Sequence, residues 1–348
     1  MRYWITGTQD GGRMVKLALV GVGAWGRNLY RTFVNMRNVD FAICCDTDPD
    51  GPPQRLNGMP RVELTTDPEA IFRDPSIDAV VIASPAITHY DLACRAIESG
   101  KDVLVEKPMT LGLAEAERLV ALAEERERVL MVGHLLEYHP AVERMKDLLD
   151  NDDFGDIYYA YSERTNLGRI RSDENAMWSL APHDVSIILY LLGEEPIEVT
   201  AHGAAYIQPG IEDVVFLVMR FAGNRLAQVH VSWLDPHKVR RTTLVGSKKM
   251  VVFDDMEPAE KIRIYDKGIE LNGTCVGYAE SFTLRFGEVS VPALEMREPL
   301  RVECEHFLEC VVSRTAPRSD GLDGLRVLKV LDAAQRSLAS GGTPIRLD

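Results

Sequence analysis

The sequence predicts two domains of different architecture. The first is a doubly wound, parallel α/β sheet, and the second is α+β, with a mostly antiparallel, open-faced sheet and helices on one side. The 348 residues exceed the size at which single cores usually divide. Strand-like apolar runs alternate with helical patterns up to Gly133, whereas from Ile157 onward strand follows strand.

We expect the first domain to cover residues 14–134 and the second to cover residues 135–348. Residues 1–13 contain Trp4 and three glycines but no apolar core of the kind that a signal peptide requires. We therefore expect a disordered leader or a mis-assigned start, with Met14 as the true beginning.

The first expected strand, Val15–Val20, leads straight into Gly21-Val22-Gly23-Ala24-Trp25-Gly26 and then into a helix over 27–35. The next strand, Asp40–Cys45, ends on Asp46, which lies 20 residues after Gly26. Strand, glycine turn, helix, strand and acid in this order are the fingerprint of a dinucleotide-binding Rossmann domain. Gly21 permits the turn, Gly23 lets the backbone approach a pyrophosphate, and Gly26 allows close packing of helix on strand.

Asp46 favours NAD over NADP as the cofactor, because its carboxylate accepts hydrogen bonds from ribose hydroxyls and repels a 2′-phosphate. Arg55 lies near enough in the sequence to leave NADP as the less favoured alternative.

Further expected strands are Ala79–Ala83, the run that ends at Val105, and Val129–Gly133. Val103-Leu104-Val105 passes directly into Glu106, Lys107 and Pro108, so a lysine stands at the carboxyl edge of the sheet, where such folds bind ligands. The other residues that we expect to touch the cofactor lie at the same edge: Ala24, Trp25, Ser84, Pro85, His89 and Glu106. A capping or surface role for His89 is an equal alternative.

The second domain carries another candidate for chemistry, His183. Pro182 predicts the start of a helix that runs to Gly193, which would place His183 in the first turn. There the helix dipole would keep the imidazole neutral, as a general base requires. The alternative is a packing or capping histidine. The closing segments Glu303–Ser313 and Leu322–Ala339 predict two more helices.

The composition argues against several classes of partner. A formal net charge of −14 disfavours nucleic acid and anionic membranes, and no apolar run has the length of a membrane span. Six cysteines without C-x-x-C spacing indicate reduced thiols in a cytoplasmic protein, and no cluster of metal ligands is evident.

With the glycine turn, Glu106-Lys107-Pro108 and Ala181-Pro182-His183-Asp184 in this order, the chain resembles the Gfo/Idh/MocA oxidoreductase family from Val15 to its end. The resemblance implies hydride transfer between NAD(P) and a sugar or cyclitol, Lys107 and His183 as catalytic residues, a cis Pro108 and a homo-oligomer, dimeric or tetrameric. The family's usual aspartate four residues before the histidine is Ser179 here.

Three stretches, Gly133–Ala141, Arg164–Gly168 and Trp178–Asp184, resemble the branch acting at C3 of UDP-N-acetylglucosamine or its uronate. That branch makes 3-keto sugars on the way to modified surface sugars such as those of polysaccharides or lipid A. The residues that we expect to bind a nucleotide-sugar substrate are Lys107, Tyr138, Arg164, Asn166, Arg169, Ser179 and His183. Alternatives are an inositol or cyclitol dehydrogenase, a sugar 3-ketoreductase, and an NAD-binding regulator without turnover. Whether Lys107 or His183 is the base stays open at this point.

Overall fold

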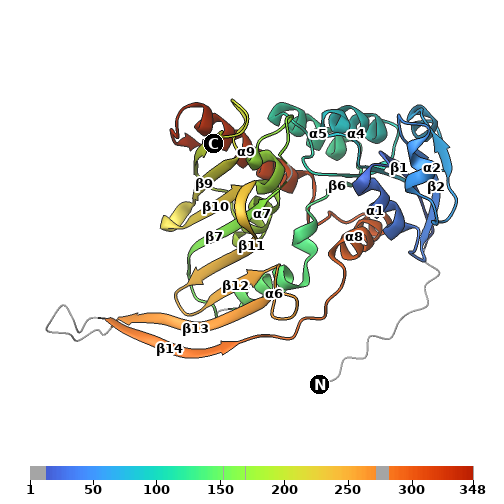
Figure 1. Ribbon diagram of the computed structural model, residues 1–348. Coiled ribbons are helices and arrows are strands. Elements are labelled where there is room, and N and C mark those ends of the chain that lie inside the picture. The colour runs from blue at the N-terminus through green and yellow to red at the C-terminus, as the bar shows by residue number, and fades with distance from the viewer. Residues whose placement is uncertain (1–12, 152, 169, 272–281, 348) are drawn as a thin grey trace, which may run out of the picture.

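The structure is a computed structural model that describes residues 13–151, 153–168, 170–271 and 282–347. Two sheets lie side by side, with the chain crossing from the first to the second after β6 (Figure 1). Apart from Arg13, the predicted leader lies outside the described residues.

The first sheet has six parallel strands in the order β3-β2-β1-β4-β5-β6, which is the doubly wound order of dinucleotide-binding domains. The strands are β1 Val15–Val20, β2 Val39–Cys45, β3 Glu63–Thr65, β4 Ala79–Ile82, β5 Asp102–Val105 and β6 Leu130–Val132. Between them run α1 Ala24–Phe33, α2 Gly51–Arg55, α3 Glu69–Phe72, the 3₁₀ helix η1 Ala86–Thr88, α4 His89–Glu98 and α5 Leu113–Glu125. Strands β4 and β5 are buried along their whole length, as parallel strands between helices must be.

Within the described residues, the second sheet has nine strands in the order β14-β13-β12-β11-β7-β10-β9-β8-β15 and is antiparallel except where β10 pairs with β7. The strands are β7 Ile157–Leu167, β8 Glu198–Ala204, β9 Val214–Arg220, β10 Leu226–Ser232, β11 Leu234–Gly246, β12 Met250–Asp254, β13 Ile262–Leu271, β14 Phe282–Ser290 and β15 Ile345–Arg346. The predicted fold class is confirmed.

Helices α6 (Pro140–Leu149), α7 (Ala176–Leu192) and α9 (Gly321–Ala339) pack on one face of the second sheet and form its core with the inward side chains. Two further 3₁₀ helices are η2 Leu135–Tyr138 and η3 Ala222–Asn224. The other face of this sheet is open. Tyr159, Tyr161 and Phe216 are exposed there by 44%, 36% and 45%.

Helix α8 (Pro299–Ser313) comes from the far end of the chain but packs on α1 and β1 of the first sheet (Figure 1). Its buried Leu300, Cys304 and Phe307 complete a core with Leu17 and Phe33. The two parts of the chain therefore share one core on this side, and the domain limits given above stay predictions.

The predicted start of α7 is wrong. The helix begins at Ala176, six residues before Pro182, because Asn175 caps it by accepting a hydrogen bond from the Trp178 amide at 3.1 Å. Pro182 then stands inside the helix, where its missing N–H leaves one helical hydrogen bond unmade. His183 is consequently one and a half turns or more from the positive end of the helix dipole, and the dipole argument for its neutrality fails.

None of the helices in the described part of the chain combines the length and the apolar character that a membrane crossing requires.

Candidate active site

A cavity of about 710 Å³ opens at the carboxyl edge of the first sheet and extends to the second domain. Lys107 and Glu106, directly after β5, lie on its first wall, and His183 of α7 lies on the opposite wall. Two of the motifs that the sequence singled out, 76 residues apart, therefore meet in one cavity.

Lys107 bridges the two walls. Its Nζ donates a hydrogen bond of 3.2 Å to the backbone carbonyl of Ser179 in α7. Burial lowers the pKa of this ammonium from its usual value, whereas the carboxylates of Glu106 and Glu174 act in the opposite direction. The peptide bond between Lys107 and Pro108 is cis, as the resemblance implied.

His183 is half-buried at the cavity wall. Its pKa lies well below the usual value, first because of burial and then because the cations Lys107 and Arg164 are near. The imidazole is therefore neutral at neutral pH, as predicted, but the cause is desolvation and neighbouring positive charge.

Glu106 also lines the cavity. Its carboxylate accepts hydrogen bonds from the indole N–H of Trp25 and from the Lys107 amide. Burial raises the pKa of Glu106 to about 7, against the opposing effects of Trp25, Lys107 and His134. Gly133 leaves room for this carboxyl group, because a Cβ there would lie 3.0 Å from it.

A second cavity of about 680 Å³ follows the glycine turn and shares Trp25, Ser84 and Pro85 with the first. Gly21 has φ +96°, and a Cβ on it would lie 2.5 Å from the Ser84 amide nitrogen, so this position requires glycine. Gly23 is the N-cap of α1, has no side-chain cap, and faces open space within 4 Å of where a Cβ would stand. An uncapped helix N-terminus beside an open backbone fits the pyrophosphate of NAD.

Asp46 braces this turn. Its carboxylate accepts hydrogen bonds from the amides of Val22 (2.7 Å) and Asp48 (3.0 Å), and it lines the cavity. Arg55 lies between Asp46 and Asp48, at 3.5 and 3.1 Å, so its charge is balanced by two carboxylates. This balance disfavours a 2′-phosphate and agrees with NAD.

His89 holds two loops of the cofactor site together. It is buried, and its ring nitrogens lie 2.8 Å from the Pro108 carbonyl and 2.9 Å from the Ser84 carbonyl. His89 therefore positions the segment after Lys107 against Ser84, and it also lines the first cavity.

Only some of the residues predicted to bind substrate line the first cavity. Arg164 and Asn166 line the first cavity, but Arg164 is paired with the buried Asp184 through Nε at 2.6 Å. Ser179 contributes its backbone carbonyl to Lys107, a contact that does not need an aspartate side chain. Arg169 lies outside the described residues.

Tyr138 does not reach the cavity. It is fully buried, its hydroxyl lies 3.0 Å from Ser319 Oγ, and Arg318 stacks over its ring. The prediction that Tyr138 contacts substrate does not agree with this position, since α8 and the segment before α9 cover it.

The sequence alone did not identify several charged residues of the first cavity: Arg171, Asp173, Glu174, Lys238 and Arg240. Lys238 and Arg240 stand two apart in β11 and so point to one face of the strand. That alternation was the available signal, but only the fold brings β11 to the cavity.

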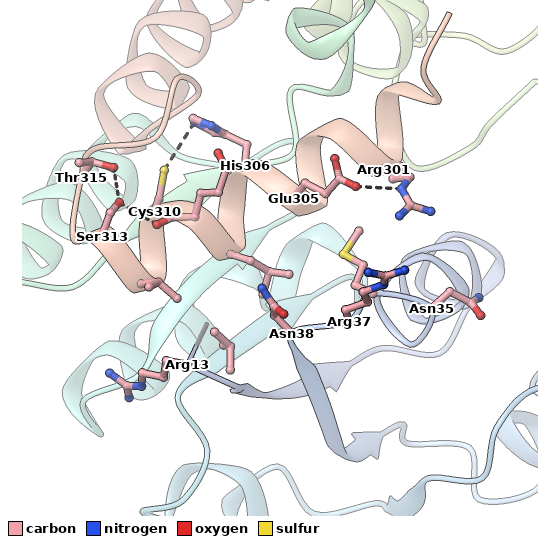
Figure 2. Close-up of a pocket in the computed structure, with 15 residues that line it drawn as sticks. Arg13, Asn35, Arg37, Asn38, Arg301, Glu305, His306, Cys310, Ser313 and Thr315 are labelled. Carbon is pink, nitrogen blue, oxygen red and sulfur yellow. Dashed lines mark hydrogen bonds and ion pairs between the residues drawn. The ribbon is translucent and has the colours of Figure 1, made fainter. Parts of the chain in front are cut away.

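Two other features lie apart from this site. A cavity of about 720 Å³ separates α8 from the turn between α1 and β2, at the amino ends of the strands (Figure 2). It contains none of the predicted site residues.

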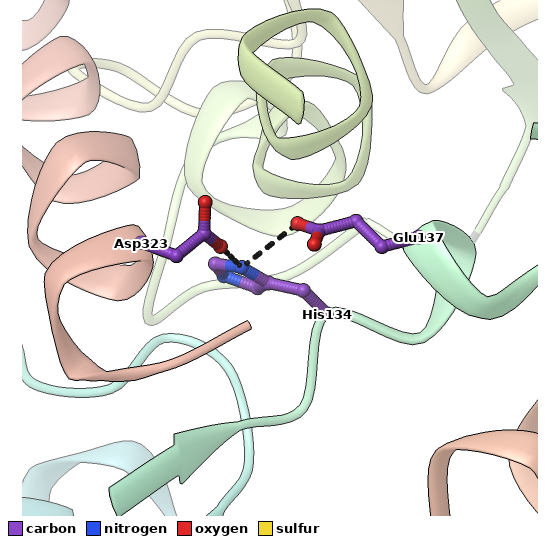
Figure 3. Close-up of side chains that lie close together, drawn as sticks. All are labelled: His134, Glu137 and Asp323. Carbon is purple, nitrogen blue, oxygen red and sulfur yellow. Dashed lines mark hydrogen bonds and ion pairs between the residues drawn. The ribbon is translucent and has the colours of Figure 1, made fainter. Parts of the chain in front are cut away.

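A buried group of His134, Glu137 and Asp323, which the sequence did not reveal, lies behind the active site (Figure 3).

Three features together define a dinucleotide-dependent oxidoreductase: the glycine turn, Asp46 beside it, and the cavity that contains Lys107 and His183. Residues 15–134 match the model described as "Oxidoreductase family, NAD-binding Rossmann fold", and residues 142–252 match the GFO/IDH/MocA C-terminal domain. The chain belongs to the Gfo/Idh/MocA family of NAD-binding oxidoreductases.

Known relatives differ in substrate. The scyllo-inositol 2-dehydrogenase (NAD(+)) of Bacillus subtilis is 26% identical over 347 residues, covering 96% of each chain. The UDP-N-acetylglucosamine 3-dehydrogenase of Acidithiobacillus ferrooxidans is 30% identical over 253 residues, covering 72% of this chain and 76% of its own. A solved structure of the latter enzyme, GnnA, superposes with a TM-score of 0.78 at 26% identity, covering 94% of this chain and 98% of that chain. Both of these relatives are dehydrogenases, and the present protein is an oxidoreductase of the same family.

The role of Gly23 can be tested by Gly23→Asp. Aspartate is a preferred N-cap residue and a Cβ at this position meets no atom within 4 Å, so the melting temperature should stay equal or rise. The carboxylate would, however, stand where the pyrophosphate approaches, and we expect NAD affinity to fall at least about tenfold, from like-charge repulsion of roughly 1.4 kcal/mol or more. Calorimetric titration with NAD measures this. Unchanged affinity in the folded variant would place the cofactor elsewhere.

Proposed function

We propose that the enzyme oxidises the C3 hydroxyl of a nucleotide sugar, UDP-N-acetylglucosamine or its uronate, to a 3-keto sugar. The observation that supports this substrate class is the positive charge on the second-domain side of the cavity. Arg171, Lys238 and Arg240 gather there in a chain of net charge −14.

These three cations are suited to an anionic ligand. Lys238 is exposed, and within the described residues no ion pair or hydrogen bond engages its ammonium. Arg171 and Arg240 are about half exposed, and each is paired with one carboxylate, Arg171 with Glu174 at 3.0 Å and Arg240 with Asp255 at 3.5 Å. A diphosphate supplies the acceptor oxygens that such groups bind, whereas inositol is uncharged.

NAD, when bound, accepts a hydride from the substrate carbon. In the proposed mechanism His183 takes the hydroxyl proton, because its imidazole is neutral and faces the cavity. Lys107 donates a hydrogen bond to the same oxygen, which orients it and stabilises developing negative charge. The Ser179 carbonyl and the Arg164–Asp184 pair hold Lys107 and α7 in place.

Substrate choice is tested by incubating the protein with NAD and UDP-N-acetylglucosamine, its uronate, myo-inositol or scyllo-inositol. We expect reduced cofactor with a nucleotide sugar and little with the inositols. Lys238→Ala should raise the KM for the nucleotide sugar about tenfold or more, since a charge-assisted contact contributes about 1.5–3 kcal/mol, and should leave NAD affinity unchanged. Turnover of an inositol alone would overturn the proposal.

The assignment of the base is tested by His183→Gln and Lys107→Met. Loss of the base should lower kcat by about 10²–10⁴-fold at pH 7 and make the remaining rate climb with pH, as hydroxide replaces the missing group. In the unchanged enzyme the acid limb of kcat/KM should lie below pH 6.5, because the pKa of His183 is lowered. If Lys107→Met shows the hydroxide dependence and His183→Gln does not, the roles are reversed.

We further propose that the open face of the second sheet forms an interface between copies of the chain. Exposed Tyr159, Tyr161 and Phe216 support this, and the apolar face continues on the β13–β14 hairpin through Leu284 and Phe286. A monomer rarely leaves so extended an apolar face in water.

The interface is tested by placing a charge on that face. Tyr161→Glu should convert the oligomer to monomers, because a carboxylate would be buried without a partner. The matched control is Tyr206→Glu, at a residue 72% exposed outside the sheet, which should change nothing. Light scattering coupled to size exclusion gives the mass, and a monomeric unchanged protein would contradict the proposal.

A further inference from the structure

His134 stands at a junction of three elements behind the active site (Figure 3). It follows β6 directly, and its Nδ1 lies 2.7 Å from Oδ2 of Asp323 in the first turn of α9. The same nitrogen lies 3.5 Å from Oε1 of Glu137 in η2. All three side chains are buried, and 189 residues separate the histidine from Asp323.

The geometry of this group favours a shared proton. Ligand atoms around a metal at about 2.0–2.2 Å stand roughly 3.3 Å apart in a tetrahedral site. The 2.7 Å separation of Nδ1 and Oδ2 is instead the length of a charge-assisted hydrogen bond. Since carboxylate oxygens only accept, Nδ1 of His134 carries a hydrogen.

Each element that packs around His134 contributes a charged or titratable group. Asp323, with Arg326 at 3.5 Å from its other oxygen, belongs to α9, and Glu137 belongs to η2. The groups on the other neighbouring elements that interact electrostatically with His134 are Glu106 after β5, His183 of α7 and Glu303 of α8.

Burial favours the neutral, protonated form of two of these carboxyl groups. Glu137 and Glu303 are buried, and within the described residues neither carboxyl accepts a hydrogen bond. Burial raises the pKa of Glu137 to about 8 and that of Glu303 well above its usual value. Asp323 is thus the principal anionic partner of His134.

We propose that His134 is a positioning residue of the active site: a buried imidazolium, hydrogen-bonded to Asp323, whose fixed positive charge favours the ionised form of Glu106 and the neutral form of His183. The part that concerns His183 rests on the proposed function. Burial alone would lower the pKa of His134, but the hydrogen bond to Asp323 and the Glu137 carboxyl oxygen at 3.5 Å outweigh it and raise the pKa to about 10.

The sign of the effect follows from charge. A cation near His183 disfavours its protonation, and a cation near Glu106 favours its ionised form. Replacing His134 with a neutral group therefore raises the pKa of both. The acid limb of kcat/KM, set by deprotonation of His183, should therefore move to higher pH in His134→Gln.

The charge itself is tested by NMR on the full chain labelled with ¹⁵N-histidine. The chain has eight histidines, and the His134 resonances are those that vanish in His134→Gln. We expect both ring nitrogens protonated at pH 8, and a neutral ring at pH 8 in Asp323→Asn. A neutral His134 in the unchanged protein at pH 8 would overturn the inference. This measurement needs no substrate, so it stands apart from any failure of the proposed function.

The kinetic consequence is tested by pH profiles of His134→Gln, with whichever substrate supports turnover. The matched control is His202→Gln, at an exposed position of β8, which should keep the acid limb in place. A purely structural role would lower the melting temperature and the rate at all pH values equally. An unmoved acid limb in a folded His134→Gln protein that binds NAD would overturn the inference.

Discussion

The hydrogen bond from Lys107 to the Ser179 carbonyl is the contact on which the site depends. An ammonium at the end of a buried strand loses its water, and a carbonyl from the other domain replaces part of that hydration. Because the acceptor is main-chain, the contact fixes where α7 must lie, and with α7 the position of His183. The serine that departs from the family pattern therefore leaves the relation between the two walls intact.

The fold was largely predictable because its strands carry their own signals. β1 has the bounds that the apolar run predicted, and the glycine turn identified the cofactor site. The predicted start of α7 was wrong because Pro182 is a strong local signal for a helix start. The actual cap, Asn175, is held by hydrogen bonds from its side-chain amide to Glu212 and Gln335, which are distant in the sequence.

The charged part of the site was less predictable. A sequence shows that Arg164, Asp184, His134 and Asp323 are ionisable, but pairing between α9 and the end of β6 arises only when the sheets are assembled. Tyr138 is an example of a predicted site residue that does not reach the site. It lies in a stretch that resembles the family, but its ring is buried in the core. Spacing predicts which edge of a sheet carries chemistry, whereas it does not predict which side chains at that edge remain free.

The position of α8 affects how the protein folds during synthesis. The core around Leu17 and Phe33 closes only when Leu300, Cys304 and Phe307 arrive, nearly 270 residues after Phe33. Synthesis proceeds from the N-terminus, so the first sheet leaves the ribosome with an apolar surface that nothing yet covers. A chain truncated before residue 299 would keep that surface exposed, and exposed apolar surface of this kind favours aggregation.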